Sequence, residues 1–147
     1  MTVYVDDARI HAKVPNGRRV HTSDWCHMMA DSVPELDAFA TNVLGLRREW
    51  RQNKRSGVHY DLTAPKVRLA LRSGARLIET NTPEWTHVVD AAKLQYWAVC
   101  PMEEYRKVRS DWRSVNYARL FSSDELTART AEAEFLAIFG RRLPLDN

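Results

Sequence analysis

The sequence lacks any long run of apolar residues, since its longest such runs are only a few residues. A helix that crosses a bilayer needs about 20 consecutive apolar residues. The chain also opens without the charged and then apolar pattern of a secretory signal segment. We therefore expect a soluble, cytoplasmic protein that does not bind membranes.

Cysteine is scarce. Cys26 and Cys100 are the only two in the 147 residues, and they lie far apart without the spacing of a metal motif. Small disulfide-stabilised domains are much richer in cysteine, so we do not expect a disulfide framework. We expect both thiols to be reduced.

The common nucleotide and nucleophile motifs are also missing. The chain has no G-x-x-x-x-G-K-[ST] loop, no G-x-G-x-x-G turn and no G-x-S-x-G elbow. The usual support for an ATPase, a dinucleotide oxidoreductase or an α/β-hydrolase is therefore absent.

Positive charge is present and unevenly distributed. The chain carries 22 Lys and Arg against 19 Asp and Glu, a net charge of +3. Residues 1–80 alone hold 13 basic and 9 acidic side chains. Basic loops of this kind favour anionic ligands, phosphates above all, although a solvated basic surface gives the same pattern. Nucleic-acid binding has some support from the basic stretch 47–55, in which Trp50 interrupts Arg and Lys residues. The modest net charge and the lack of a recognised nucleic-acid motif argue against giving it more weight.

Strand and helix patterns alternate through the first eighty residues. β-Branched and aromatic residues predict strands, and apolar residues at spacings of three and four predict helices. The expected strands are 2–5, 58–62 and 76–79, with a further short one at 46–50; the expected helices are 32–44 and 63–73, and 8–24 is expected to be a long basic loop.

A strand–helix–strand order implies a small, mostly parallel sheet with flanking helices, because parallel neighbours need a crossover. The fold class is therefore α/β. Residues 81–147 instead carry only helical patterns, broken at Pro101. We expect an α/β domain over 1–80 and an all-helical extension over 81–147 that packs on it.

Several short motifs occur in a fixed order along residues 2–80. The segment resembles an uncharacterised domain-of-unknown-function family of actinobacteria and their phages. The resemblance implies a small bacterial or phage domain, located in the host cytoplasm if phage-encoded, and it names relatives without naming a reaction. The motifs that carry it are YVDD (4–7), WxH (25–27), ADS (30–32), LGLR (44–47) and HYDLT (59–63), followed by Lys66.

Histidine and aspartate side chains gather at the expected carboxyl ends of the strands, where α/β sheets bind ligands. Carboxylates hold Mg²⁺ or Mn²⁺ in phosphoryl-transfer sites, and a histidine titrates near working pH. The expected metal ligands are Asp6, Asp31 and Asp61, and the expected catalytic residues are Asp6, Asp7, His27, His59 and Asp61.

Other residues around this cluster are candidates to bind the ligand itself. Basic side chains would steer an anion, and aromatic or histidine side chains would contact it. The candidates are Arg9, His21, Trp25, Arg47, Tyr60 and Lys66. Zinc held by His21, His27 and His59 is a weaker alternative, because no pair has the tight helical spacing of zinc motifs.

The leading hypothesis is a small enzyme or ligand-binding domain that acts on a phosphate-bearing compound, a nucleotide or a nucleic acid, with metal-dependent hydrolysis as its chemistry. Each aspartate also has a simpler interpretation as a loop or helix cap. The alternative function is that of a non-enzymatic accessory protein whose helical part binds a protein partner. Exposed Trp85, Trp97 or Trp112 would favour that alternative.

Overall fold

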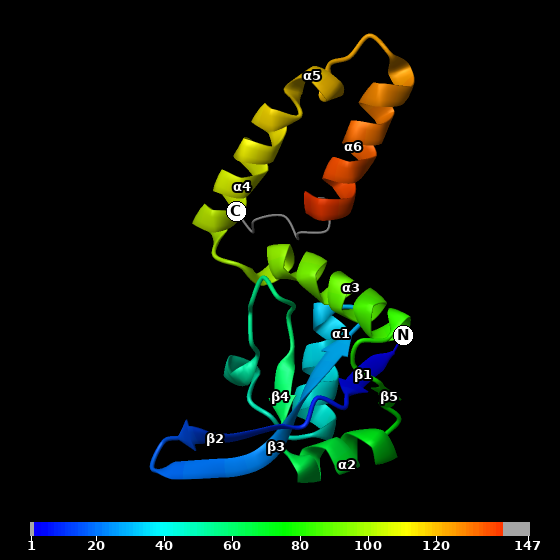
Figure 1. The fold of residues 1–147 in the computed structure, drawn as a ribbon. Coiled ribbons are helices and arrows are strands. Elements are labelled where there is room, and N and C mark those ends of the chain that lie inside the picture. Colours follow the sequence, from blue (N-terminus) through cyan, green and yellow to red (C-terminus); the bar gives the residue numbers. More distant parts are fainter. Residues whose placement is uncertain (1, 140–147) are drawn as a thin grey trace. The chain divides into compact units, whose positions relative to one another are not determined.

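The computed structural model describes residues 2–139, which fall into two compact units divided between Lys93 and Leu94 (Figure 1). The first unit contains strands β1 (Val3–Asp6), β2 (Ile10–Asn16), β3 (Arg19–Ala30), β4 (Tyr60–Leu62) and β5 (Arg76–Ile78). Its helices are α1 (Val33–Ala38) with the π-helical turn η1 (Phe39–Val43), the 3₁₀ turn η2 (Arg48–Trp50), α2 (Ala64–Arg72) and the start of α3 (Pro83–Val99).

The sheet is mostly antiparallel. Strands β2, β1 and β4 all pair with β3 in antiparallel fashion, and only β5 runs parallel to its neighbour β1. The α/β class and the C-terminal helices predicted from the sequence are confirmed, but the prediction of a mostly parallel sheet is wrong. The error arises at residues 8–24, which form the β2–β3 hairpin rather than a loop.

That hairpin is hard to see in the sequence because most of its side chains are exposed, so it carries no apolar alternation. Its turn lies at Gly17, whose φ of +61° is a conformation that L side chains rarely adopt. Residues 46–50 also differ from the prediction, because Arg48–Trp50 is a 3₁₀ turn.

The sheet carries a helix layer on each face. On one face Val88 and Ala92 of α3 pack on Met29 and Ile78. Successive strand residues alternate in direction, so Val5 and Met28 point to the opposite core, where Leu36 of α1 and Ala70 of α2 are fully buried. Asp6, His27 and Asp61 are therefore placed on the α3 face of the sheet.

A buried polar network ties α1 to the loop before β4. Asp37 of α1 accepts a hydrogen bond from the Tyr60 hydroxyl at 2.7 Å and pairs with the guanidinium of Arg51. Burial raises the pKa of Tyr60 well above its usual range, and the neighbouring Asp37 carboxylate raises it further. This network fixes the segment that leads into β4.

The second unit consists of the end of α3, α4 (Met102–Val115), α5 (Tyr117–Leu120) and α6 (Glu125–Phe139). Aromatic rings form its core: Trp112 lies 5.4 Å from Phe135 and Trp97 lies 6.0 Å from Phe139 between ring centroids. No helix among residues 2–139 is long and apolar enough to span a membrane.

Replacing Asp37 with alanine should lower the free energy of unfolding by about 3 kcal/mol, because it leaves the Arg51 charge and the Tyr60 hydroxyl buried without their partner. Urea denaturation followed by circular dichroism measures the change. The control is Glu49→Ala, which removes an exposed ion pair with Arg47 and should cost under about 0.5 kcal/mol. Equal losses in both variants would contradict this account of the network.

Candidate functional site

A break in the β-ladder creates the site. Val5 pairs with Met28, whereas Ile10 pairs with Trp25, so the β1–β2 side contains two more residues than β3 between these pairs. The extra residues form a bulge at Asp7–Arg9, in which Arg9 takes a positive φ of 49°. Bulges of this kind redirect side chains and are common beside functional sites.

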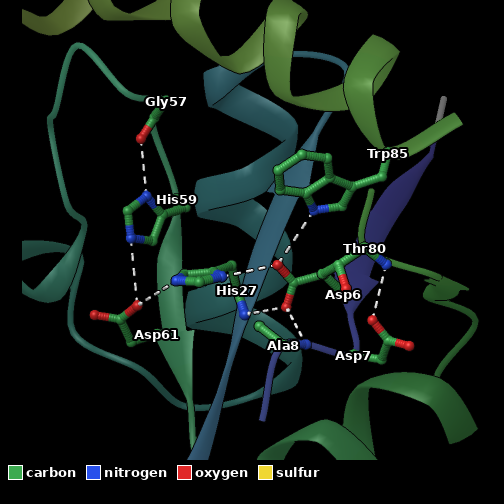
Figure 2. Close-up of polar contacts among 9 residues, drawn as sticks. All are labelled: Asp6, Asp7, Ala8, His27, Gly57, His59, Asp61, Thr80 and Trp85. Atoms are coloured by element: carbon green, nitrogen blue, oxygen red, sulfur yellow. Dashed lines mark hydrogen bonds and ion pairs between the residues drawn. The ribbon is translucent and has the colours of Figure 1, made fainter. Parts of the chain in front are cut away.

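The Asp6 carboxylate fills this break. Its Oδ1 accepts hydrogen bonds from the backbone N–H of His27 at 2.9 Å and of Ala8 at 3.3 Å. Its Oδ2 accepts from His27 Nδ1 at 2.8 Å and lies 3.5 Å from Trp85 Nε1 (Figure 2). With a side chain only 1% exposed, Asp6 is a buried carboxylate whose lone pairs are used by protein donors.

Asp6 and His27 form a charge-assisted pair. Burial raises the pKa of Asp6, but the hydrogen bonds from the His27 side chain and backbone outweigh it and leave the pKa below its usual value. The hydrogen bond to Asp6 raises the pKa of His27 against the opposing effect of burial. Because a carboxylate can only accept here, the proton of neutral His27 must be on Nδ1, and Nε2 keeps its lone pair.

His59 is oriented in the same way by a different acceptor. Its Nδ1 lies 2.8 Å from the carbonyl oxygen of Gly57, which can only accept, so Nδ1 is again the donor. Gly57 has a φ of +131°, and a Cβ there would lie 3.2 Å from the Cβ of Ala92 on α3. The backbone that holds His59 therefore requires glycine at this position.

Three acceptor atoms consequently face one another. Asp61 Oδ1 lies 3.3 Å from His59 Nε2 and 3.9 Å from His27 Nε2, and one ligand atom from each residue lies within 4.8 Å of the others. Figure 2 shows both imidazole rings directed at Asp61. Two nitrogen lone pairs and a carboxylate oxygen repel one another unless a proton or a cation lies between them. We call Asp6, His27, His59 and Asp61 the His/Asp cluster.

The structure does not bring the other predicted carboxylates into this cluster. Asp31 accepts from the backbone N–H of Thr2 and from the Tyr4 hydroxyl, at 2.9 and 3.0 Å. Asp7 accepts from the backbone N–H of Thr80 at 2.8 Å, which ties the end of β1 to the end of β5. The oxygen-rich set of Asp6, Asp31 and Asp61 is therefore not assembled, because each of the first two carboxylates is used for backbone donors.

Three of the expected ligand-binding residues have structural contacts elsewhere. Tyr60 points to the opposite core, as strand alternation requires, and Lys66 Nζ donates to the Leu44 carbonyl at 2.5 Å. Arg47 is exposed and paired with Glu49 at 3.2 Å. The remaining three, Arg9, His21 and Trp25, belong to the β2–β3 hairpin, where His21 is exposed and Trp25 Nε1 donates to the Ala12 carbonyl.

Sequence reasoning did not assign Trp85, the Gly57 carbonyl or Lys54 to this cluster. Burial raises the pKa of Asp61, but the hydrogen bond from His59 and the positive charges around it, Lys54 among them, leave the pKa below its usual value. The charge of Lys54 also opposes the rise in the pKa of His27. Gly57, two residues before His59, gave a local signal as a turn residue. Trp85 gave none, because its contact with Asp6 joins residues 79 positions apart.

One family model, described as "Protein of unknown function (DUF4031)", matches residues 3–91. The chain belongs to the DUF4031 family. The match continues past the expected limit at residue 80 and includes every member of the His/Asp cluster as well as Trp85. No curated protein and no solved structure matches the chain significantly. The segment that matches the DUF4031 model thus contains the whole candidate site.

Replacing Asp6 with asparagine should lower the free energy of unfolding by about 2 kcal/mol, because an amide nitrogen at the Oδ2 position cannot accept from His27 Nδ1. The neighbouring Asp7→Asn is the matched control. Asp7 is held by one backbone donor to Oδ1, which asparagine can also accept, so its cost should stay well below that of Asp6→Asn. Chemical denaturation of both variants measures the difference, and a loss as large in Asp7→Asn would exclude the special role of Asp6.

Proposed function

We propose that residues 2–93 form a metal-dependent phosphoesterase domain whose ion is held by His27 Nε2, His59 Nε2 and Asp61 Oδ1. The observation that carries the proposal is the convergence of these three lone-pair atoms while both Nδ1 positions donate to other groups. Metal-binding histidines commonly donate their second ring N–H to a carboxylate or a carbonyl in this manner.

The spacing suits a first-row transition metal. Ligand atoms that are each 2.0–2.2 Å from a tetrahedral zinc lie about 3.3–3.6 Å from one another. The two separations from Asp61, 3.3 and 3.9 Å, are close to that geometry, and the three ligand atoms all lie within 4.8 Å of one another. Asp61 takes the place that the sequence-based zinc alternative had given to His21.

The ligand types favour zinc, manganese or iron over magnesium. Two imidazoles and one carboxylate form a mixed N/O set, whereas Mg²⁺ prefers oxygen ligands and retains most of its water. The magnesium expected from the sequence depended on a trio of carboxylates that does not form. Manganese, the other expected metal, accepts this set.

Three protein ligands leave a coordination position for water, as in catalytic rather than structural metal sites. The bound ion would lower the pKa of that water, and the resulting hydroxide would add to phosphorus while the bond to the ester oxygen breaks. The proton lost by the water balances the proton gained by the departing alkoxide. Asp6 holds the His27 ring in position, and Lys54 supplies positive charge for an anionic substrate.

The first test is metal binding by isothermal titration calorimetry with Zn²⁺ and Mn²⁺. Wild type should bind one ion per chain, and Asp61→Asn and His59→Gln should weaken binding by about 100-fold or more. Asp6→Asn should weaken it by about tenfold, since it acts through His27. The control is His21→Ala, an exposed histidine outside the cluster. Binding that is unchanged in Asp61→Asn, or equally weakened in His21→Ala, would refute the site.

The second test is hydrolysis of bis(4-nitrophenyl) phosphate by the metal-loaded protein. Turnover should be lost on chelation with EDTA and return when Zn²⁺ or Mn²⁺ is added. We expect Asp61→Asn to be at least about 100-fold slower and His21→Ala to match wild type. Metal binding without turnover of this diester or of nucleotide esters would overturn the hydrolase assignment while leaving the metal site in place.

Protein binding by the helical unit is the second candidate function. Large apolar side chains are exposed along the end of α4, through α5 and into α6, among them Val115 at 84%, Phe121 at 65% and Leu126 at 74%. Trp85, Trp97 and Trp112 do not contribute to this surface, since each is partly buried. Exposed apolar side chains that gather in a patch mark interaction surfaces, and on these exposures the unit is a candidate to bind a protein partner even if the hydrolase assignment fails.

A further inference from the structure

Beyond the bulge the sheet extends as a two-stranded ribbon, residues 10–25, which together with the last bulge residue, Arg9, we call the arm. Within it, residues 10–16 pair with residues 19–25 and with no other strand. Strand β3 joins β1 and β4 only from Cys26 onward. Figure 1 shows β2 and the first half of β3 extending away from the helices of the first unit. Most arm residues are exposed, so the arm contributes little to the core.

The net charge of the chain is concentrated in this arm. Arg9, Lys13, Arg18 and Arg19 are basic and Asp24 is its only acidic residue, so the arm has a net charge of +3, equal to that of the whole chain. Outside the arm, basic and acidic residues balance at 18 each. The arm's single carboxylate is itself paired with His11 at 2.8 Å. A second basic stretch, residues 47–55, holds five basic residues and one acidic residue, but acidic residues elsewhere outside the arm offset it.

The basic side chains run along the length of the arm. Arg9 lies at its base, Lys13 in the middle of β2, and Arg18 and Arg19 at its tip. Seven residue pairs at about 3.3 Å per residue make a ribbon of about 20 Å. Such a ribbon fits the major groove of a duplex, and cations repeated along it match the regular charges of a phosphodiester backbone. A single phosphate-bearing metabolite would engage only one end of it.

The arm also begins and ends at the His/Asp cluster. Its first strand starts after the bulge that follows Asp6, and its second strand continues into His27. Trp25 donates its Nε1 proton to the Ala12 carbonyl at 3.0 Å and so links the two strands near the cluster. A polyanion bound along the arm is thereby directed to the same end of the sheet as the cluster.

From this segregation of charge and this connection we infer that the arm binds the phosphodiester backbone of a nucleic acid and delivers it to the His/Asp cluster. The delivery step rests on the proposed function, but binding by the arm does not. The inference narrows the substrate from any phosphate ester to a polynucleotide.

Binding is tested by fluorescence anisotropy with three labelled 20-nucleotide probes: duplex DNA, single-stranded DNA and single-stranded RNA. The experiment uses the full chain with Asp61→Asn, in EDTA, so that no probe is cleaved. This protein, whose arm is unchanged, should bind at least one probe at 50 mM salt, and the affinity should fall steeply as the salt concentration rises. The probe bound most tightly identifies the form of nucleic acid. No binding of any probe at 50 mM salt would overturn the inference.

The decisive comparison is between two double variants of equal charge. Arg18→Ala/Arg19→Ala removes two positive charges from the tip of the arm, whereas Arg68→Ala/Arg72→Ala removes two exposed positive charges from α2. The arm variant should bind about tenfold or more weakly at 100 mM salt, and its slope of log K against log salt should fall by about 2 for duplex DNA. The α2 variant should bind like wild type; an equal loss in both would show only general attraction to a basic protein and refute the arm.

The arm and the hydrolase can fail separately. Arg18→Ala/Arg19→Ala should turn over bis(4-nitrophenyl) phosphate at the wild-type rate but cleave the preferred nucleic acid about tenfold or more slowly. Intact nucleic-acid binding with no turnover of either substrate refutes the hydrolase alone. Turnover of both substrates that is unaffected by the arm variant refutes the arm alone.

Discussion

The site depends on one buried carboxylate, that of Asp6, which accepts hydrogen bonds from four donors. The bulge at Asp7–Arg9 interrupts the ladder between β1–β2 and β3, and it leaves the His27 backbone N–H without a strand partner. Oδ1 of Asp6 replaces that partner, while Oδ2 orients the His27 ring and lies within reach of Trp85 on α3. A buried carboxylate is costly to desolvate unless donors surround it, so the fold and the site stabilise each other.

Hydrogen bonds to fixed acceptors also orient the imidazole rings of His27 and His59. Each ring donates Nδ1–H to an acceptor that is fixed by tertiary structure, a carboxylate for His27 and a backbone carbonyl for His59. Each therefore presents an Nε2 lone pair to Asp61, which has no proton to offer at neutral pH. With both rings neutral these atoms are acceptors without a donor, and a proton on an imidazole or a bound cation would satisfy them. The proposed metal centre rests on this arrangement rather than on the mere proximity of histidines.

In the first unit, the apolar core and the net positive charge lie in different segments of the chain. Buried apolar residues beneath α1, α2 and α3 fix the sheet, while a ribbon with almost no core carries the net positive charge. An isolated two-stranded ribbon is marginally stable in water, and this arm is held to the rest of the unit near its base, where Ser23 Oγ accepts a hydrogen bond from the backbone N–H of Ala64 at 3.0 Å. Exposed basic side chains that do not pack in a core favour association of the arm with an anion over a structural role.

Much of the first unit was predictable from local sequence. The apolar spacing of 32–44 and 63–73 placed α1 with η1 and α2, and the β-branched residues of Val3–Asp6 and Arg76–Ile78 placed two strands. The sequence also indicated His27, His59 and Asp61 as chemically interesting, because polar residues at strand ends are seldom needed for packing. The segment 8–24 could not be predicted as strands, since residues exposed on both faces carry no period of two.

By itself, therefore, the sequence determined which segments are apolar on one side, which glycines permit turns, and which residues are able to hold a metal. Only the tertiary structure decided that Asp6 serves as the acceptor for His27 while Asp31 binds Thr2 and Tyr4 instead. The physical reason is that strand register and the two-residue bulge fix which side chains meet. Register is specified where one face of a strand is buried, and the mostly exposed residues of 8–24 carry no apolar pattern that would reveal it in the sequence.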